Sequence, residues 1–117
     1  MLATISLVVS AIVGLLHVYF MVLETFLWTK PLGLKTFGQK LEDAEKSKVL
    51  AANQGVYNGV LGAFLIASVI ADLGPTRMIL LVFVVIVGLY GAATVSPRIA
   101  LVQALPAAIA LALMAVS

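Results

Sequence analysis

Four long apolar runs, separated by short polar segments, make up almost the whole chain. The runs cover about 2–28, 47–71, 78–95 and 99–116, and the longest polar segment is 29–46. A helix needs roughly 20 apolar residues to cross a bilayer. A lipid-exposed open sheet would leave backbone groups without hydrogen bonds, so strands are not expected. The pattern predicts an all-α polytopic membrane protein, a single domain over 1–117 folded as a four-helix transmembrane bundle.

Local residues support these helix limits. Ser96 suits an N-cap, and Pro97 suits the first helical position, where its missing N–H costs nothing. Gly74-Pro75 is a turn signal between the second and third runs. Pro106 falls inside the fourth run and should bend that helix. Residues 1–16 contain no Lys or Arg, so the first run is interpreted as a permanent helix and not as a cleaved signal peptide.

Composition agrees with a membrane location. The chain is 63% hydrophobic and 10% charged, whereas soluble domains carry about 25% charged residues. The absence of cysteine excludes disulfides and thiolate metal sites. A net charge of +2 gives no reason to expect a nucleic-acid partner. The lipid bilayer is therefore the expected partner, and the composition identifies no cofactor.

The basic residues predict the orientation of the chain. One side of the predicted bundle carries six of them and the other side only Arg77; the six are Lys30, Lys35, Lys40, Lys46, Lys48 and Arg98. Lys and Arg are concentrated in cytoplasmic loops. We therefore expect a multi-pass protein of the inner (plasma) membrane with loop 29–46 in the cytoplasm and both termini outside it.

Polar side chains inside the predicted helices gather in the cytoplasmic half of the membrane. His17 and Glu24 are seven residues apart, so they share one helix face about 10 Å apart along the axis. The second helix runs antiparallel and brings amides to the same levels. The predicted chamber opens toward the cytoplasm and comprises His17, Glu24, Asn53, Gln54, Tyr57, Asn58, Tyr90 and Gln103.

Each of these residues can be assigned either a functional role or a purely structural one. Glu24 is the candidate catalytic acid or base and His17 its proton partner, while the amides and tyrosines would orient a ligand. Each alone is explained as well by interhelical hydrogen bonding, and the clustering at one depth is what favours a site. Gly55 and Gly59 are interpreted as a helix-packing surface on a different flank of the second helix, and Trp28 as an interfacial aromatic. With a single histidine in the chain, no metal site is expected.

Two segments resemble a known family. HVYFMVLETFLWTKPLGLKTFG (17–38) and KVLAANQGVYNG (48–59) are similar to the bacterial membrane family called domain-of-unknown-function 1304. The resemblance extends over the whole length, including the four-helix arrangement, and includes both His17 and Glu24. It implies a small polytopic inner-membrane protein and supplies no activity.

Three functions are compatible with these residues. The first is a cytoplasm-facing site that binds a small or amphipathic molecule, with or without catalysis. The second is a proton-coupled small-molecule transporter, although its site should lie near the midplane and Glu24 is closer to the edge. The third is a non-catalytic subunit of a membrane complex. Four short helices enclose little volume, so a homo-oligomer is expected for any of the three.

Overall fold

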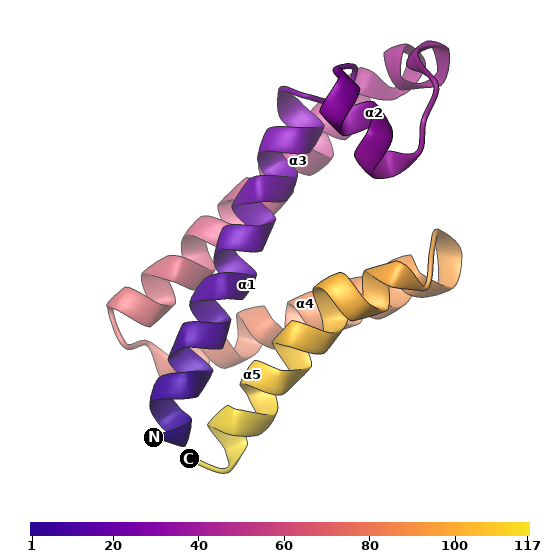
Figure 1. Cartoon of the computed structure of the whole chain (residues 1–117). Coiled ribbons are helices and arrows are strands. Elements are labelled where there is room, and N and C mark those ends of the chain that lie inside the picture. Colours follow the sequence, from indigo (N-terminus) through magenta and orange to yellow (C-terminus); the bar gives the residue numbers. More distant parts are fainter. The chain divides into compact units, whose positions relative to one another are not determined.

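The computed structural model describes residues 1–117 and contains helices only (Figure 1). The elements are α1 Leu2–Thr25, α2 Pro31–Phe37, α3 Leu41–Ile70, α4 Gly74–Thr94, the π-helical turn η1 Ala100–Ala104 and α5 Leu105–Ala115. The prediction of an all-α fold is confirmed.

Three of the helices, α1, α3 and α4, are long and apolar enough to cross a membrane, which indicates a membrane location. Large apolar side chains face outward along them, such as Val8, Phe64 and Ile86, each more than half exposed. The fourth apolar run forms a shorter helix, Ala100–Ala115. The confirmed part of the prediction is therefore three membrane-capable helices, and the count of four stays a prediction.

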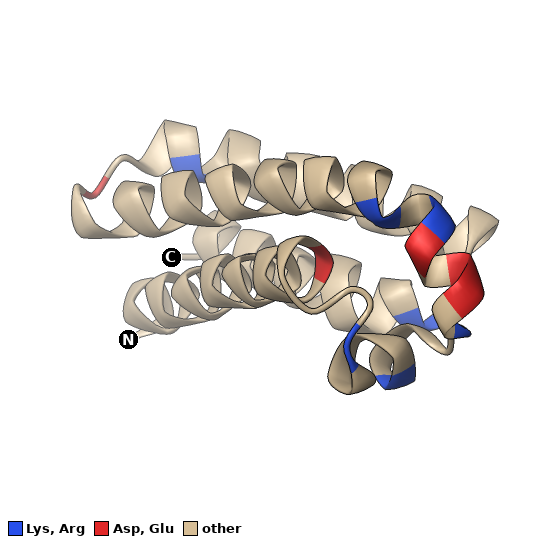
Figure 2. Cartoon of the chain, turned by 90° about the horizontal axis from the view of Figure 1, so that it is seen from above, with Lys and Arg blue, Asp and Glu red and all other residues tan.

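The polar segment 29–46 is not a plain loop. It contains α2, which ends at Gly38, where a φ of 62° suits glycine. After α2, α3 begins at Leu41, in the polar segment ahead of the apolar run that starts at about 47. Glu42 and Asp43 occupy its first turn, where acids favour the helix dipole. Figure 2 shows that most of the charged residues cluster at α2 and at the first turns of α3.

The chain forms two compact units, and each is described by itself. Unit 2 is 16–63 and contains the C-terminal part of α1, all of α2 and the N-terminal part of α3. Its buried side chains include Leu23, Ala44 and Ala51. Two glycines of α3, Gly55 and Gly59, allow α1 to approach closely.

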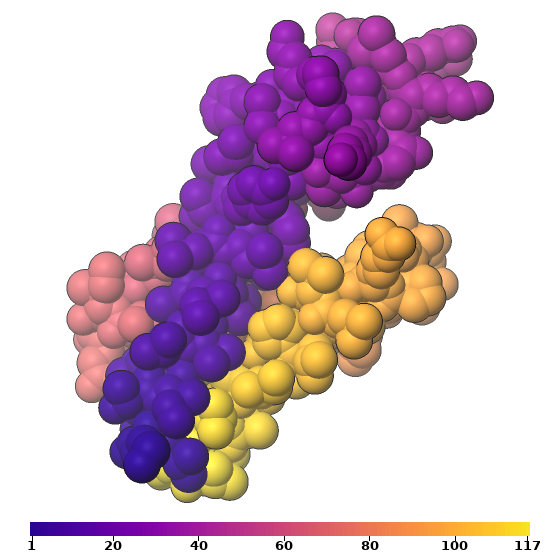
Figure 3. Space-filling view, viewed as in Figure 1, coloured from indigo at the N-terminus to yellow at the C-terminus, as the bar shows by residue number.

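Unit 1 combines 1–15 with 64–117. In it, α4 packs against η1 and α5. A side chain at Gly88 would meet the backbone of Ala104 at 2.9 Å, so glycine is what permits this contact. Ser6 donates a hydrogen bond to the Ala110 carbonyl at 2.8 Å and thereby joins α1 to α5. Figure 3 shows the indigo N-terminal segment against the yellow C-terminal segment.

The start of the fourth apolar run has an unusual backbone. Ser96 Oγ accepts a hydrogen bond from the Arg98 N–H at 3.3 Å, which fits the predicted N-cap. Farther along, the Leu105 N–H bonds to the Ala100 carbonyl, five residues back. Pro106 has no N–H to continue the ordinary ladder. A π-helical turn in front of this proline is thus the local response to it.

Candidate functional site

The main polar contact of unit 2 joins Glu24 of α1 to Asn58 of α3. Asn58 Nδ2 donates a hydrogen bond to Glu24 Oε1 at 2.5 Å, and both side chains are partly buried. Two of the polar residues singled out in the sequence are therefore in direct contact. An amide that donates to a carboxylate forms a charge-assisted bond when the carboxylate is ionised, which is stronger than a neutral one.

Two glycines of α3 form the surface on which α1 rests. A Cβ on Gly55 would collide with Thr25 Oγ1, and one on Gly59 would collide with Met21 Sδ. Gly55 and Gly59 are both buried. The close approach brings α1 near enough to α3 for the Glu24–Asn58 bond. Glycines and Asn58 thus belong to one interface with α1, and not to separate flanks of α3.

Thr25 is left with an unsatisfied hydroxyl at this interface. Its Oγ1 is buried and has no hydrogen-bond partner. A buried polar group without a partner is costly. The hydroxyl can therefore bind a donor or acceptor supplied by a ligand or by water.

His17 is placed differently from Glu24. Its ring is fully buried and packs edge-on against Phe20, with 5.4 Å between the ring centroids. A side chain enclosed in this way serves packing more directly than proton exchange. The structure gathers no set of His, Asp and Glu residues that could hold a metal ion.

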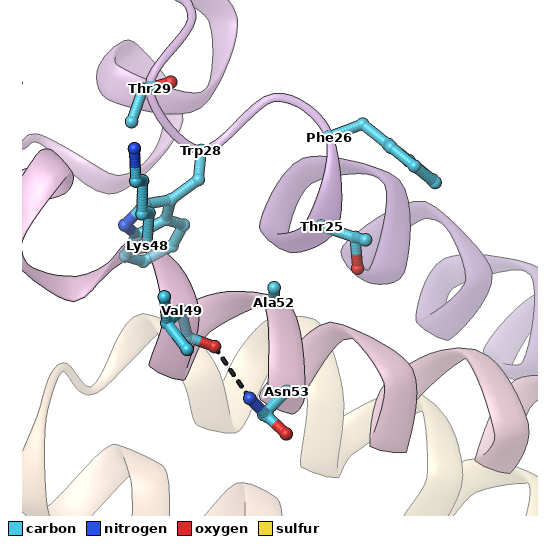
Figure 4. A pocket seen from close by; sticks show the side chains of 8 residues that line it. All are labelled: Thr25, Phe26, Trp28, Thr29, Lys48, Val49, Ala52 and Asn53. Carbon is cyan, nitrogen blue, oxygen red and sulfur yellow. Dashed lines mark hydrogen bonds between the residues drawn. The ribbon is translucent and has the colours of Figure 1, made fainter.

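An open cavity of about 340 Å³ lies between the end of α1 and the start of α3. Figure 4 shows the residues that follow or end α1 on one side and residues of α3 on the other. It is lined by Thr25, Phe26, Trp28, Thr29, Lys48, Val49, Ala52 and Asn53. Glu24 does not line it, but it is the direct neighbour of Thr25 in the chain.

Trp28 is held firmly in the cavity wall. Its indole Nε1 donates to Ser47 Oγ at 3.1 Å, and its ring lies 4.9 Å from that of Phe37 between centroids. Lys48 forms an ion pair with Glu45 at 3.1 Å. Both partners of that pair are about half exposed, and exposed pairs contribute little stability. Lys48 can therefore exchange Glu45 for another anion at small cost.

The other predicted site residues of α3 take no part in the Glu24–Asn58 hydrogen bond. Asn53 lines the cavity, is exposed, and donates from Nδ2 to the Val49 carbonyl at 2.9 Å (Figure 4). Gln54 is exposed, and Tyr57 is 74% exposed. Tyr90 and Gln103 belong to α4 and η1 of unit 1, so their place in a common chamber stays a prediction.

The cavity adds residues that the sequence pattern did not identify as a site. Trp28 was interpreted as an interfacial aromatic and Lys48 as a topology signal. The sequence did contain one indication of this site, because Trp28 and Lys48 lie at the same end of two helices predicted to be antiparallel. What the pattern lacked was the turn after Thr25, which directs Trp28 back toward α3. That turn contains the Leu27 N–H bond to the Val22 carbonyl at 3.2 Å.

Fold and site together define a small helical membrane protein with a polar contact between two of its membrane-capable helices. The chain belongs to the family described as protein of unknown function (DUF1304), whose model matches residues 11–115. It is 36% identical over 103 residues to the uncharacterized protein YpaA of Lactococcus lactis subsp. lactis (strain IL1403), covering 84% of this chain and 86% of YpaA. No solved structure matches the chain.

Proposed function

We propose that this protein binds a small amphipathic molecule in the cavity between α1 and α3, on the cytoplasmic side of the membrane. The observation that carries the proposal is the composition of the cavity wall. Trp28, Val49 and Ala52 offer apolar surface, and Lys48, Thr29 and Asn53 offer polar groups. Ligand sites combine these two kinds of surface, since apolar contact supplies affinity and a few polar groups fix orientation.

The polar groups favour an acidic head group on the ligand. Lys48 supplies a cation that is held only by an exposed partner. Thr25 supplies a buried hydroxyl without a partner. A carboxylate or phosphate at the level of Lys48 would be stabilised by both charge and hydrogen bonds. Its apolar tail would lie along Trp28 and out toward the lipid.

Glu24 is assigned a positioning role in this proposal. It lies next to Thr25 in α1 and is tied to α3 by Asn58. That bond fixes the separation of the two helices whose ends form the cavity. A catalytic role for Glu24 with His17 is not proposed, because His17 is fully buried against Phe20.

Trp28 provides a direct test, because it is the single tryptophan of the chain and lines the cavity. The purified protein in phosphatidylcholine nanodiscs is titrated with 9,10-dibromostearate, whose bromines quench nearby indoles. We expect quenching that saturates at one equivalent and is displaced by unbrominated stearate. Quenching that rises linearly with the probe content of the bilayer contradicts the proposal.

Two alanines of α3 provide a matched pair of variants. Ala52→Leu fills the cavity, whereas Ala63→Leu adds the same atoms at an exposed position that does not line it. Saturable quenching should be lost in Ala52→Leu and kept in Ala63→Leu. Lys48→Gln should weaken stearate about tenfold, which corresponds to roughly 1.4 kcal/mol. Equal behaviour of the two alanine variants would favour a helix-bundle subunit without a ligand.

A further inference from the structure

Arg77 of unit 1 is a buried cation with free donors. The residue is only 7% exposed, and its Nε and Nη1 are buried without a hydrogen-bond partner. The two ion pairs of the structure lie at the start of α3 and do not involve it. A buried charge without a partner costs several kcal/mol by general estimates. An anion that bound these donors would remove that cost.

The position of Arg77 in its helix increases the demand for an anion. It lies in the first turn of α4, a helix of 21 residues whose first turn contains no acid. Leu73 at the N-cap provides no side-chain hydrogen bond. The N-terminus of a helix carries a partial positive charge. Helical side chains lean toward the N-terminus, so the Arg77 side chain leaves the helix toward the positive end of the helix dipole.

The turn before α4 places this cation at a membrane surface. It joins α3 to α4, two helices long and apolar enough to cross a bilayer, so its level is that of the lipid head groups. Asp72, the nearest acid in the chain, is exposed and forms no ion pair with Arg77. The residues beside Arg77, Thr76 and Met78, are exposed as well. The cation therefore lies just beneath a surface where phosphate is abundant.

We propose that Arg77 and the first turn of α4 form a binding site for a phosphate group. The planar guanidinium presents paired N–H donors that match two phosphate oxygens, and helix N-termini bind phosphate through the same charge and backbone donors. The Arg77 side chain turns toward the exposed surface at Thr76 and Met78 to bring Nε and Nη1 onto the anion. A lipid head group and free phosphate share this chemistry.

Thermal unfolding in a neutral detergent tests the site and separates the two sources. The protein is titrated with inorganic phosphate, with phosphatidylglycerol, and with diolein as the phosphate-free lipid. We expect a saturable rise of the unfolding midpoint with phosphatidylglycerol and none with diolein. A similar rise with inorganic phosphate assigns the site to free phosphate, and its absence assigns it to the lipid. No saturable rise with either phosphate compound overturns the proposal.

Charge-matched variants locate the effect. Arg77→Met replaces the buried cation by an apolar chain, and Arg98→Met removes the same charge from an exposed position. Arg77→Met should unfold at no lower temperature than the wild type without phosphate and should lose the phosphatidylglycerol shift, which Arg98→Met should keep. A full shift in Arg77→Met overturns the proposal. If Arg77→Met does not fold, Arg77→Lys, which lacks the paired donors, should need at least tenfold more phosphatidylglycerol; equal affinity overturns the proposal.

Discussion

Asn58 and Glu24 form a hydrogen bond of 2.5 Å that joins α3 to α1. The contact is possible because Gly55 and Gly59 have no side chains, so Thr25 and Met21 of α1 lie directly against the backbone of α3. Hydrogen bonds between helices in membranes contribute about 0.6 kcal/mol on average and up to roughly 2 kcal/mol. The bond is therefore expected to stabilise the helix pair measurably without being its main source of stability.

Glu24→Gln should be tolerated, whereas Asn58→Leu should destabilise. A glutamine keeps an oxygen that accepts from Asn58, but a leucine at 58 leaves the Glu24 carboxylate without its donor. We expect Asn58→Leu to lower the free energy of unfolding by about 1–2 kcal/mol and Glu24→Gln to lower it by less. Thermal unfolding in detergent measures both.

Gln54→Leu serves as the control for this pair, since Gln54 is an exposed amide on the same helix. It should change stability by less than about 0.5 kcal/mol. If Glu24→Gln were as damaging as Glu24→Ala, the carboxylate itself would be a structural requirement. If Asn58→Leu were neutral, the bond would contribute nothing to the helix pair.

The glycines should differ in their tolerance of an added methyl group. At Gly55 a Cβ meets the short Thr25 side chain and, at 3.2 Å, the Met21 carbonyl, neither of which can move far. At Gly59 it meets the flexible end of the Met21 side chain. Overpacking costs about 1–3 kcal/mol, so Gly55→Ala should lie in that range and Gly59→Ala below it. Unfolding in detergent decides the order, and the reverse order would contradict this packing.

Ser47→Ala should loosen Trp28. Ser47 Oγ accepts the indole N–H, and loss of one such bond costs about 1 kcal/mol. The fluorescence anisotropy of Trp28 should fall. Thr36→Ala is the control, because the Thr36 hydroxyl bonds only to the Leu32 carbonyl of its own helix. Equal anisotropy in the two variants would show that the Ser47 contact does not hold the indole.

Single cysteines can test the orientation, because the chain has none of its own. Lys35→Cys and Arg98→Cys should be protected from a membrane-impermeant maleimide added to intact cells. Asp72→Cys and Ser117→Cys should react. This outcome requires four crossings with loop 29–46 in the cytoplasm. If Ser117→Cys shared the protection of Arg98→Cys, the short helix Ala100–Ala115 would not cross.

The sequence alone determined that the chain is helical and suited to a membrane, because long apolar runs leave few other ways to satisfy the backbone. It also identified Glu24 and Asn58, since polar side chains are costly among apolar ones. The sequence pattern showed 29–46 only as a polar, charged loop and did not reveal α2 within it. This helix is short and depends on Pro31 at its start and Gly38 at its end. Such short helices have little intrinsic stability and form through tertiary packing.

Only the tertiary structure decided which polar residues meet. Gln54 and Asn58 are four residues apart and share a helix face within the precision of helical geometry. Yet Asn58 bonds to Glu24 while Gln54 is exposed, because Gly55 and Gly59 set the line along which α1 rests. Likewise Arg77 reads as a topology signal in the sequence, and its burial without a partner follows from packing in unit 1. The spacing of residues along a helix fixes the angle between their side chains about the axis of that helix. How the helix is rotated against its neighbour depends on the side-chain volumes of both helices.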